Sequence, residues 1–154
     1  MERQLRDHLE LWERLIRAHS GIVARLEEEM ERAQGLSLRW YEVLLHLSRA
    51  PDGAMRMQDL ADLALQSKSG LTRVVDRMEE AGLVTRQTCP SDRRGVLAVV
   101  TPEGRRRFRR AAALHVRGIE RHFGRHLSGA EPAALRSLVD RLLQSQAIDQ
   151  RSAD

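Results

Sequence analysis

The chain of 154 residues has little cysteine, few aromatic side chains and no long hydrophobic run, and each shortage excludes a class of protein. Its single cysteine, Cys89, rules out an intramolecular disulfide and a cysteine-based zinc finger. No run of about 18 apolar residues could cross a membrane, and residues 1–7 lack the apolar segment of a signal peptide. We therefore expect a soluble, cytoplasmic protein with no membrane partner. Aromatic residues make up only 3% of the chain, so we expect its core to be aliphatic.

The sequence also lacks the patterns of common enzymes. It contains no glycine-rich phosphate loop, no H-E-x-x-H pair and no nucleophile elbow, and its Ser, His and Asp residues match no catalytic spacing. We therefore predict that the protein is not an enzyme and needs no cofactor.

Charge is abundant but unevenly distributed. Charged residues make up 31% of the chain, and the net charge is +4. Residues 67–110 contain eleven Lys or Arg against five Asp or Glu, whereas residues 1–34 contain six against eight. A basic middle between near-neutral flanks is typical of a domain that binds phosphates.

Residues 58–101 organise the rest of the chain. A short helical pattern with Leu60 and Leu63 is followed by a polar break at residues 66–67 and a second helix that ends at Gly82. That helix has one apolar stripe, formed by Leu71, Val74, Val75 and Met78. Two strand-like runs, 83–88 and 96–101, flank a basic turn at 90–95. This order predicts a winged helix-turn-helix, whose second helix enters the major groove of DNA and whose hairpin tip reaches a minor groove.

The flanks are predicted to be helical, which makes the fold mostly α (α+β). Residues 3–33 carry a heptad-like apolar stripe that includes Leu9, Trp12 and Ile16 and is longer than one small domain needs. We expect residues 1–34 and 111–154 to form a helical dimerisation region around a winged helix-turn-helix domain at 35–110. The alternative is that the first helix simply covers its own core.

Three segments together resemble one family of regulators. GLTRVVDRMEEAGLV at 70–84 and DRRGVLAVVTPEG at 92–104 closely resemble the core of the MarR (multiple antibiotic resistance regulator) family, and LSLRWYEVL at 36–44 extends the resemblance more weakly. The resemblance implies a homodimeric repressor that binds a pseudo-palindromic site in double-stranded DNA and is released by a small phenolic or aromatic effector. It also implies that Arg94 enters the minor groove and that Asp92 braces it.

The candidate DNA-binding residues lie on the second helix and on the hairpin tip. Base-edge and phosphate contacts are predicted for Arg73, Arg77 and the residues at the start of the helix, with Arg93 on phosphate at the tip. Asp76 fits either a solvated helix face or a pair with Arg73 or Arg77. The full prediction is Ser67, Lys68, Ser69, Thr72, Arg73, Arg77, Asp92, Arg93 and Arg94. The alternative is a solvated helix and a hairpin kept soluble by its charges.

Other polar residues point to sensing sites. His19 lies within the apolar stripe of the first helix and is either a core histidine or, with Trp12, Trp40 and Tyr41, part of an effector pocket. His122 and His126 are spaced as two zinc ligands, but no third ligand is evident, so we predict no metal site. Cys89 fits a passive, half-buried thiol.

The basic run Arg105–Arg110 fits either phosphates beside the wing or a solvated, ion-paired helix surface. Two other functions also remain open for the whole chain. One is a nucleoid-type DNA-binding protein with little sequence preference, and the other is a helical protein-interaction module.

Overall fold

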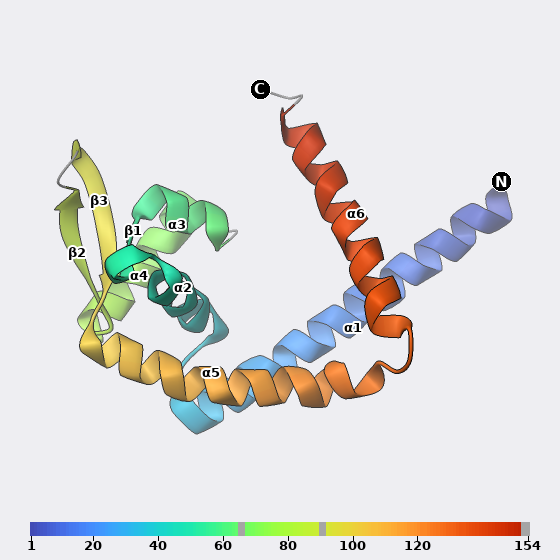
Figure 1. The fold of residues 1–154 in the computed structure, drawn as a ribbon, viewed down its shortest axis with the longest axis horizontal. Helices are drawn as coiled ribbons and strands as arrows, with labels where there is room; N and C mark the ends of the chain where they lie inside the picture. The colour runs from blue at the N-terminus through green and yellow to red at the C-terminus, as the bar shows by residue number, and fades with distance from the viewer. Residues whose placement is uncertain (65–66, 90–91, 152–154) are drawn as a thin grey trace. The chain divides into compact units, whose positions relative to one another are not determined.

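The computed structural model describes residues 1–64, 67–89 and 92–151, and the side chains of residues 93–94 and 146–151 are outside that description. The chain is mostly helical with one small sheet, as predicted (Figure 1). In order, its elements are α1 (Glu2–Gln34), α2 (Leu38–Arg49), a 3₁₀ turn (Pro51–Gly53), β1 (Ala54–Arg56), α3 (Met57–Leu63), α4 (Lys68–Glu80), β2 (Val84–Cys89), β3 (Asp92–Val100), α5 (Pro102–His122), a second 3₁₀ turn (Gly124–His126) and α6 (Glu131–Arg151). It divides into two compact units, Met1–Gly118 and Ile119–Asp154.

Local capping sets the ends of the helices in the first unit. Gly35, in the left-handed region with φ of 55°, ends α1, and the side chain of Ser37 accepts a hydrogen bond from the Trp40 N–H to start α2. Ser67 caps α4 in the same way through the Gly70 N–H. At the other end Gly82 has φ of 71°, and the N–H groups of Gly82 and Leu83 donate to carbonyls in the last turn of α4. Only glycine adopts this conformation without strain. α4, the second or recognition helix of the predicted helix-turn-helix, therefore ends where the sequence predicted.

The three strands form an antiparallel sheet in the order β1-β3-β2. β3 pairs with β1 through Val99 opposite Ala54, and with β2 along almost its whole length. The register shifts between Thr88 and Cys89, close to the hairpin tip. β1 is only three residues long and leads directly into α3, which begins at Met57.

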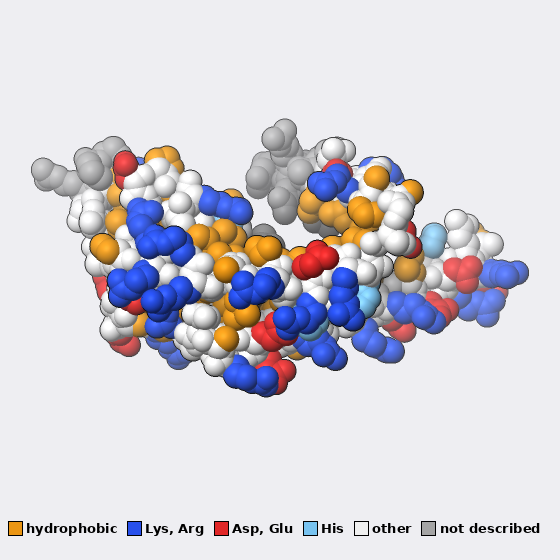
Figure 2. Space-filling model, turned by 60° about the horizontal axis from the view of Figure 1, so that its bottom comes forward, with side chains coloured by type: hydrophobic (Ala, Val, Ile, Leu, Met, Phe, Trp, Pro, Cys, Tyr) orange, Lys and Arg blue, Asp and Glu red, His pale blue; other side chains and the backbone are white. Residues whose placement is uncertain are grey.

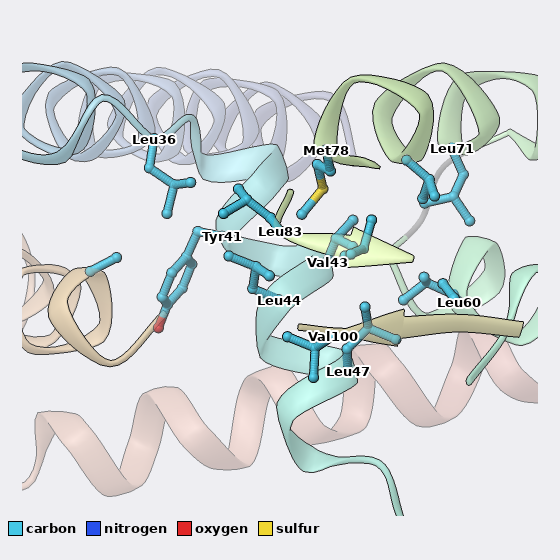
Figure 3. Packing of buried hydrophobic residues seen from close by; sticks show 14 of the residues in the cluster. Leu36, Tyr41, Val43, Leu44, Leu47, Leu60, Leu71, Met78, Leu83 and Val100 are labelled. Carbon is cyan, nitrogen blue, oxygen red and sulfur yellow. The ribbon is translucent and has the colours of Figure 1, made fainter. Parts of the chain in front are cut away.

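α2 is at the centre of the core of the first unit. Its residues Val43, Leu44 and Leu47 are fully buried, and they face apolar side chains from α3, α4 and the sheet (Figure 3). Leu71 of α4 is likewise fully buried. Burial of this aliphatic set fixes the recognition helix against its support and leaves its opposite side in solvent.

Thr101 joins the end of the recognition helix to the start of α5. Its hydroxyl donates to the Gly82 carbonyl at 2.7 Å and accepts from the Gly104 N–H at 3.0 Å. Gly104 packs so closely that a Cβ there would overlap the carbonyl oxygen of Leu83. The start of α5 is therefore held directly against the residues that follow α4.

The terminal helices leave large apolar side chains exposed within the single chain. On α1 these are Leu5, Leu9, Leu11, Trp12, Leu15, Ile16 and Val23, with Trp12 at 60% exposure. α5 ends at His122, because Phe123 leaves the helical region and a 3₁₀ turn follows. Ile119 and Phe123, near the end of α5, are 39% and 40% exposed. None of the helices in the described ranges is long and apolar enough to cross a membrane.

Candidate nucleic-acid interface

One face of α4 is polar and exposed. Ser67, Lys68, Ser69, Thr72, Arg73 and Arg77 are all exposed, whereas Leu71, Val75 and Met78 of the same helix are buried. The Thr72 hydroxyl donates to the Lys68 carbonyl at 2.8 Å. The structure therefore brings these six predicted residues together on one side of a helix whose other side is fixed in the core.

Two of the three acids on α4, Asp76 and Glu79, are bound by an arginine from the neighbouring strand, while the third, Glu80, is exposed. Arg86 of β2 contacts Asp76 at 2.6 Å and Glu79 at 2.7 Å, and its N–H also donates to the Thr72 carbonyl at 3.3 Å. The backbone N–H of Arg86 donates to Glu79 as well. Of the two interpretations left open for Asp76, the pair with Arg73 or Arg77 is wrong, because its partner, Arg86, lies on the neighbouring strand.

This arrangement has two effects on the α4 surface. Arg86 neutralises carboxylates that would otherwise repel phosphate, and it ties the recognition helix to the wing at several points. The only signal in the sequence was a pair of acids three residues apart, followed by an arginine in the next strand. Cross-element partners of this kind cannot be assigned from spacing alone.

The wing begins at Asp92, the first residue of β3. The Asp92 carboxylate lies 3.2 Å from the guanidinium of Arg56, which precedes α3. Arg56 occupies the N-cap position of α3 without a capping side-chain bond, and it contacts the wing instead. The side chains of Arg93 and Arg94 lie outside the described part of the chain, so the bracing of Arg94 by Asp92 stays a prediction.

The basic run at the start of α5 is partly structural. Arg107 donates to the carbonyls of Gln34 and Gly35 at the C-terminal end of α1, and Arg105 donates to the Asp52 carbonyl. Cations at a helix C-terminus interact favourably with its dipole and its unpaired carbonyls. These two arginines therefore hold elements of the first unit together. Figure 2 shows Lys and Arg side chains over the lobe that carries the sheet and also along the long helices.

An apolar cavity of about 680 Å³ lies between α1, α2 and α5. Its lining includes His19, Tyr41 and His115, with the rings of Tyr41 and His115 4.6 Å apart. Burial lowers the pKa of His115, and its Nδ1 is buried without a hydrogen-bond partner among the described residues. Burial also raises the pKa of Tyr41, an effect that the charge of Arg49 partly opposes.

The other predicted sensing residues are dispersed. Trp12 is exposed on α1, and Trp40 borders a separate depression beside α4. His122 ends α5, and His126 falls in the following 3₁₀ turn. Within the described ranges no group of three or more His, Cys, Asp or Glu side chains could hold a metal ion. Cys89 is buried at the end of β2.

Comparisons with known proteins agree with this geometry. A family model described as MarR family matches residues 34–95. AbsC, a MarR family transcriptional regulator from Streptomyces coelicolor, is 37% identical over 92% of this chain and 93% of its own, with a TM-score of 0.81. Sco3205, a MarR family regulator from the same organism solved in complex with DNA, is 29% identical over 90% and 87% of the two chains, with a TM-score of 0.85. The regulator FarR of Neisseria gonorrhoeae is 30% identical over 94 residues, which span 61% of this chain and 62% of FarR.

The fold and its polar helix face define a winged-helix DNA-binding protein. The chain belongs to the MarR family and is a DNA-binding transcriptional regulator, not an enzyme.

Proposed function

We propose that the protein acts as a homodimer that represses transcription by binding a pseudo-palindromic duplex site. In this proposal residues 35–110 form the DNA-binding domain, and residues 1–34 and 111–154 form the dimerisation region. Two copies of α4 enter successive major grooves about one helical turn apart. The residues that contact DNA are Ser67, Lys68, Ser69, Thr72, Arg73, Arg77, Arg93 and Arg94, with Asp92 orienting Arg94.

The observation that carries this proposal is the division of charge on and beside α4. Arg73 and Arg77 are exposed and make no ion pair among the described residues, while Asp76 and Glu79 are both bound by Arg86. Free guanidinium groups beside neutralised acids leave a surface suited to phosphate and to the acceptor atoms of guanine. The DNA complex of Sco3205 supports the same use of the fold.

Dimerisation is supported by the apolar surface of α1. Leu9 and Trp12 are 55% and 60% exposed, within a stripe that continues to Val23. An apolar face of this length on an isolated chain is costly in water, and a second copy of the same helix would cover it.

A small aromatic ligand would control the regulator through the cavity lined by His19, Tyr41 and His115. The cavity has the size and the apolar lining of a small-molecule site, and the unpartnered Nδ1 of His115 offers a polar group to a phenol or an acid. A ligand that binds better to a dimer with altered helix spacing would shift the population away from the DNA-bound state. Trp12 and Trp40 do not border this cavity and have no place in this part of the proposal.

The first test is binding to the DNA upstream of the protein's own gene, titrated with salt and with unrelated duplex as competitor. Tight binding that resists competitor and weakens steeply with salt is the expected result. If unrelated duplex displaces the protein from the upstream DNA as well as the upstream DNA itself does, the protein is of the nucleoid type instead. No binding at low salt, together with unchanged function in Arg73→Ala and Arg94→Ala, would indicate a protein-interaction module.

The ligand is tested on the same complex. Simple phenols and aromatic acids such as salicylate are titrated into the protein–DNA complex, and His115→Phe serves as the variant that removes the polar group from the cavity. We expect at least one compound to weaken DNA binding of the native protein and to do so less in the variant. If no compound changes DNA affinity, the effector proposal is wrong.

A further inference from the structure

A depression between the start of α2 and the exposed face of α4 is lined by three arginines and no acidic side chain. Its volume is about 300 Å³, and its lining is Ser37, Arg39, Trp40, Gly70, Arg73, Val74 and Arg77. Arg73 and Arg77 lie one turn apart on α4, and Arg39 approaches from the first turn of α2. Like charges gathered around one depression repel each other unless an anion lies between them.

None of the guanidinium groups of these three arginines makes a hydrogen bond or an ion pair within the part of the chain that the structure describes. The charge of Arg39 acts on Glu42, whose pKa is raised by burial and lowered in part by His46 and then by Arg39. The cavity beneath the wing differs, because there Arg56 and Lys68 share the lining with two acids, Asp59 and Asp92. Of these two neighbouring hollows, only the one at α2 has a purely cationic set of charged groups.

The backbone of α2 adds little free binding capacity to this depression. Ser37 accepts the Trp40 N–H, and the carboxylate of Glu27 accepts the Leu38 N–H at 2.8 Å. Glu27 thereby offsets part of the positive helix end. The three guanidinium groups, each with five fixed donors, are therefore the groups that an anion would contact.

We propose that this depression binds a backbone phosphate of DNA and that Arg39 is a DNA-contacting residue supplied from outside the helix-turn-helix. The inference rests on the proposed DNA-binding role of α4. When α4 lies in a major groove, the groups beside its first turns meet the phosphates along the groove edge. Arg39 then contributes affinity and register without reading sequence.

The test uses the full-length chain with Arg39→Gln, and Arg49→Gln is the matched control. Arg49 is an exposed arginine at the opposite end of the same helix, about 15 Å from Arg39 along the helix axis. Arg49→Gln therefore removes the same charge from the same helix. Arg39→Lys keeps the charge and removes the planar fork. Thermal unfolding and dimer mass are measured for each variant, so that a folding defect is separated from a defect in DNA binding alone.

For Arg39→Gln we expect a drop in DNA affinity of roughly tenfold or more, equal on the operator and on unrelated duplex. The slope of log affinity against log salt should fall by about 0.9 for each phosphate that the protein no longer neutralises, or about 1.8 for a dimer. Arg49→Gln should keep the native slope, and Arg39→Lys should keep most of the slope with reduced affinity.

Each other outcome overturns the proposal. An unchanged salt slope in Arg39→Gln would show that Arg39 neutralises no phosphate. An equal drop in DNA affinity in Arg49→Gln would show that the effect comes from the net charge of the protein and not from the position of Arg39. A drop confined to the operator would make Arg39 a base-reading residue. Failure of the native protein to bind any DNA is a different result, because it removes the proposed function itself.

Discussion

The lobe around α2 buries its apolar side chains, whereas the long helix α1 leaves those up to Val23 exposed. In the lobe Leu44 and Leu71 are fully buried, whereas Leu9 and Trp12 of α1 are more than half exposed. Both regions carry regular apolar stripes, so the difference does not lie in the pattern. It lies in whether the covering surface belongs to the same chain. The lobe is covered by its own chain, whereas α1 is covered only toward its C-terminal end, at Leu26 and Met30, and its stripe up to Val23 stays exposed in the single chain.

The largest expected effect comes from breaking the lobe. Leu44→Ala removes a fully buried side chain and should lower the free energy of unfolding by about 2–5 kcal/mol. Leu9→Ala on α1 is the matched change and should instead weaken self-association, because its side chain is exposed in the single chain. Urea denaturation at several protein concentrations separates the two. Equal, concentration-independent decreases in stability would refute the contrast between the regions.

The second largest expected effect is on stability and comes from replacing one glycine that packs against the lobe and one in α1. Gly104→Ala places a Cβ against the Leu83 carbonyl and should cost about 1–3 kcal/mol of stability. Gly21→Ala, in the middle of α1 with open space around its Cα, should stabilise the helix by about 0.5–1 kcal/mol. Thermal unfolding measures both, and a stabilised Gly104→Ala variant would contradict the close packing at the start of α5.

A third effect concerns function rather than folding. Arg86→Ala releases Asp76 and Glu79 beside the DNA-binding face and should lower DNA affinity roughly tenfold, because two carboxylates then repel phosphate. Arg14→Ala breaks an exposed ion pair on α1, with Glu10, and should leave affinity unchanged. Adding Asp76→Asn and Glu79→Gln to Arg86→Ala should restore part of the affinity in a competition assay. No recovery would show that Arg86 acts only through the position of α4.

The smallest expected change is at Arg56. Arg56→Ser removes a half-exposed ion pair with Asp92 but adds a capping hydroxyl to α3, so the two contributions should nearly cancel and leave stability within about 1 kcal/mol. Thermal unfolding checks this balance. A decrease well above that range would show that the ion pair with the wing matters more than an exposed ion pair usually does.

Local patterns predicted most of the fold. The apolar stripe of α4 and the glycine that ends this helix depend on neighbours within a few residues, so the sequence alone predicted them. The partners of Arg86 and Arg56 depend on which strand lies beside which helix, and spacing alone does not determine that.

Helical periodicity also could not predict the exposure of two apolar residues or the lining of the cavity. Ile119 and Phe123 have the spacing of a buried helical stripe, yet they are 39% and 40% exposed, because periodicity shows which side chains share a face and not what covers that face. The effector prediction grouped four aromatic or imidazole residues, and the structure brings only His19 and Tyr41 to one cavity. His115 of α5 joins them from 96 residues after His19 and 74 after Tyr41, which no local signal revealed.

The hydroxyl of Thr101 has a mechanical consequence. One oxygen contacts both Gly82, two residues after α4, and the first turn of α5, although the hairpin of β2 and β3 lies between the two helices in the chain. The end of α4 and the start of α5 are therefore joined directly as well as through the hairpin. A displacement at the start of α5 has a short route to the end of α4 that does not pass along the sheet.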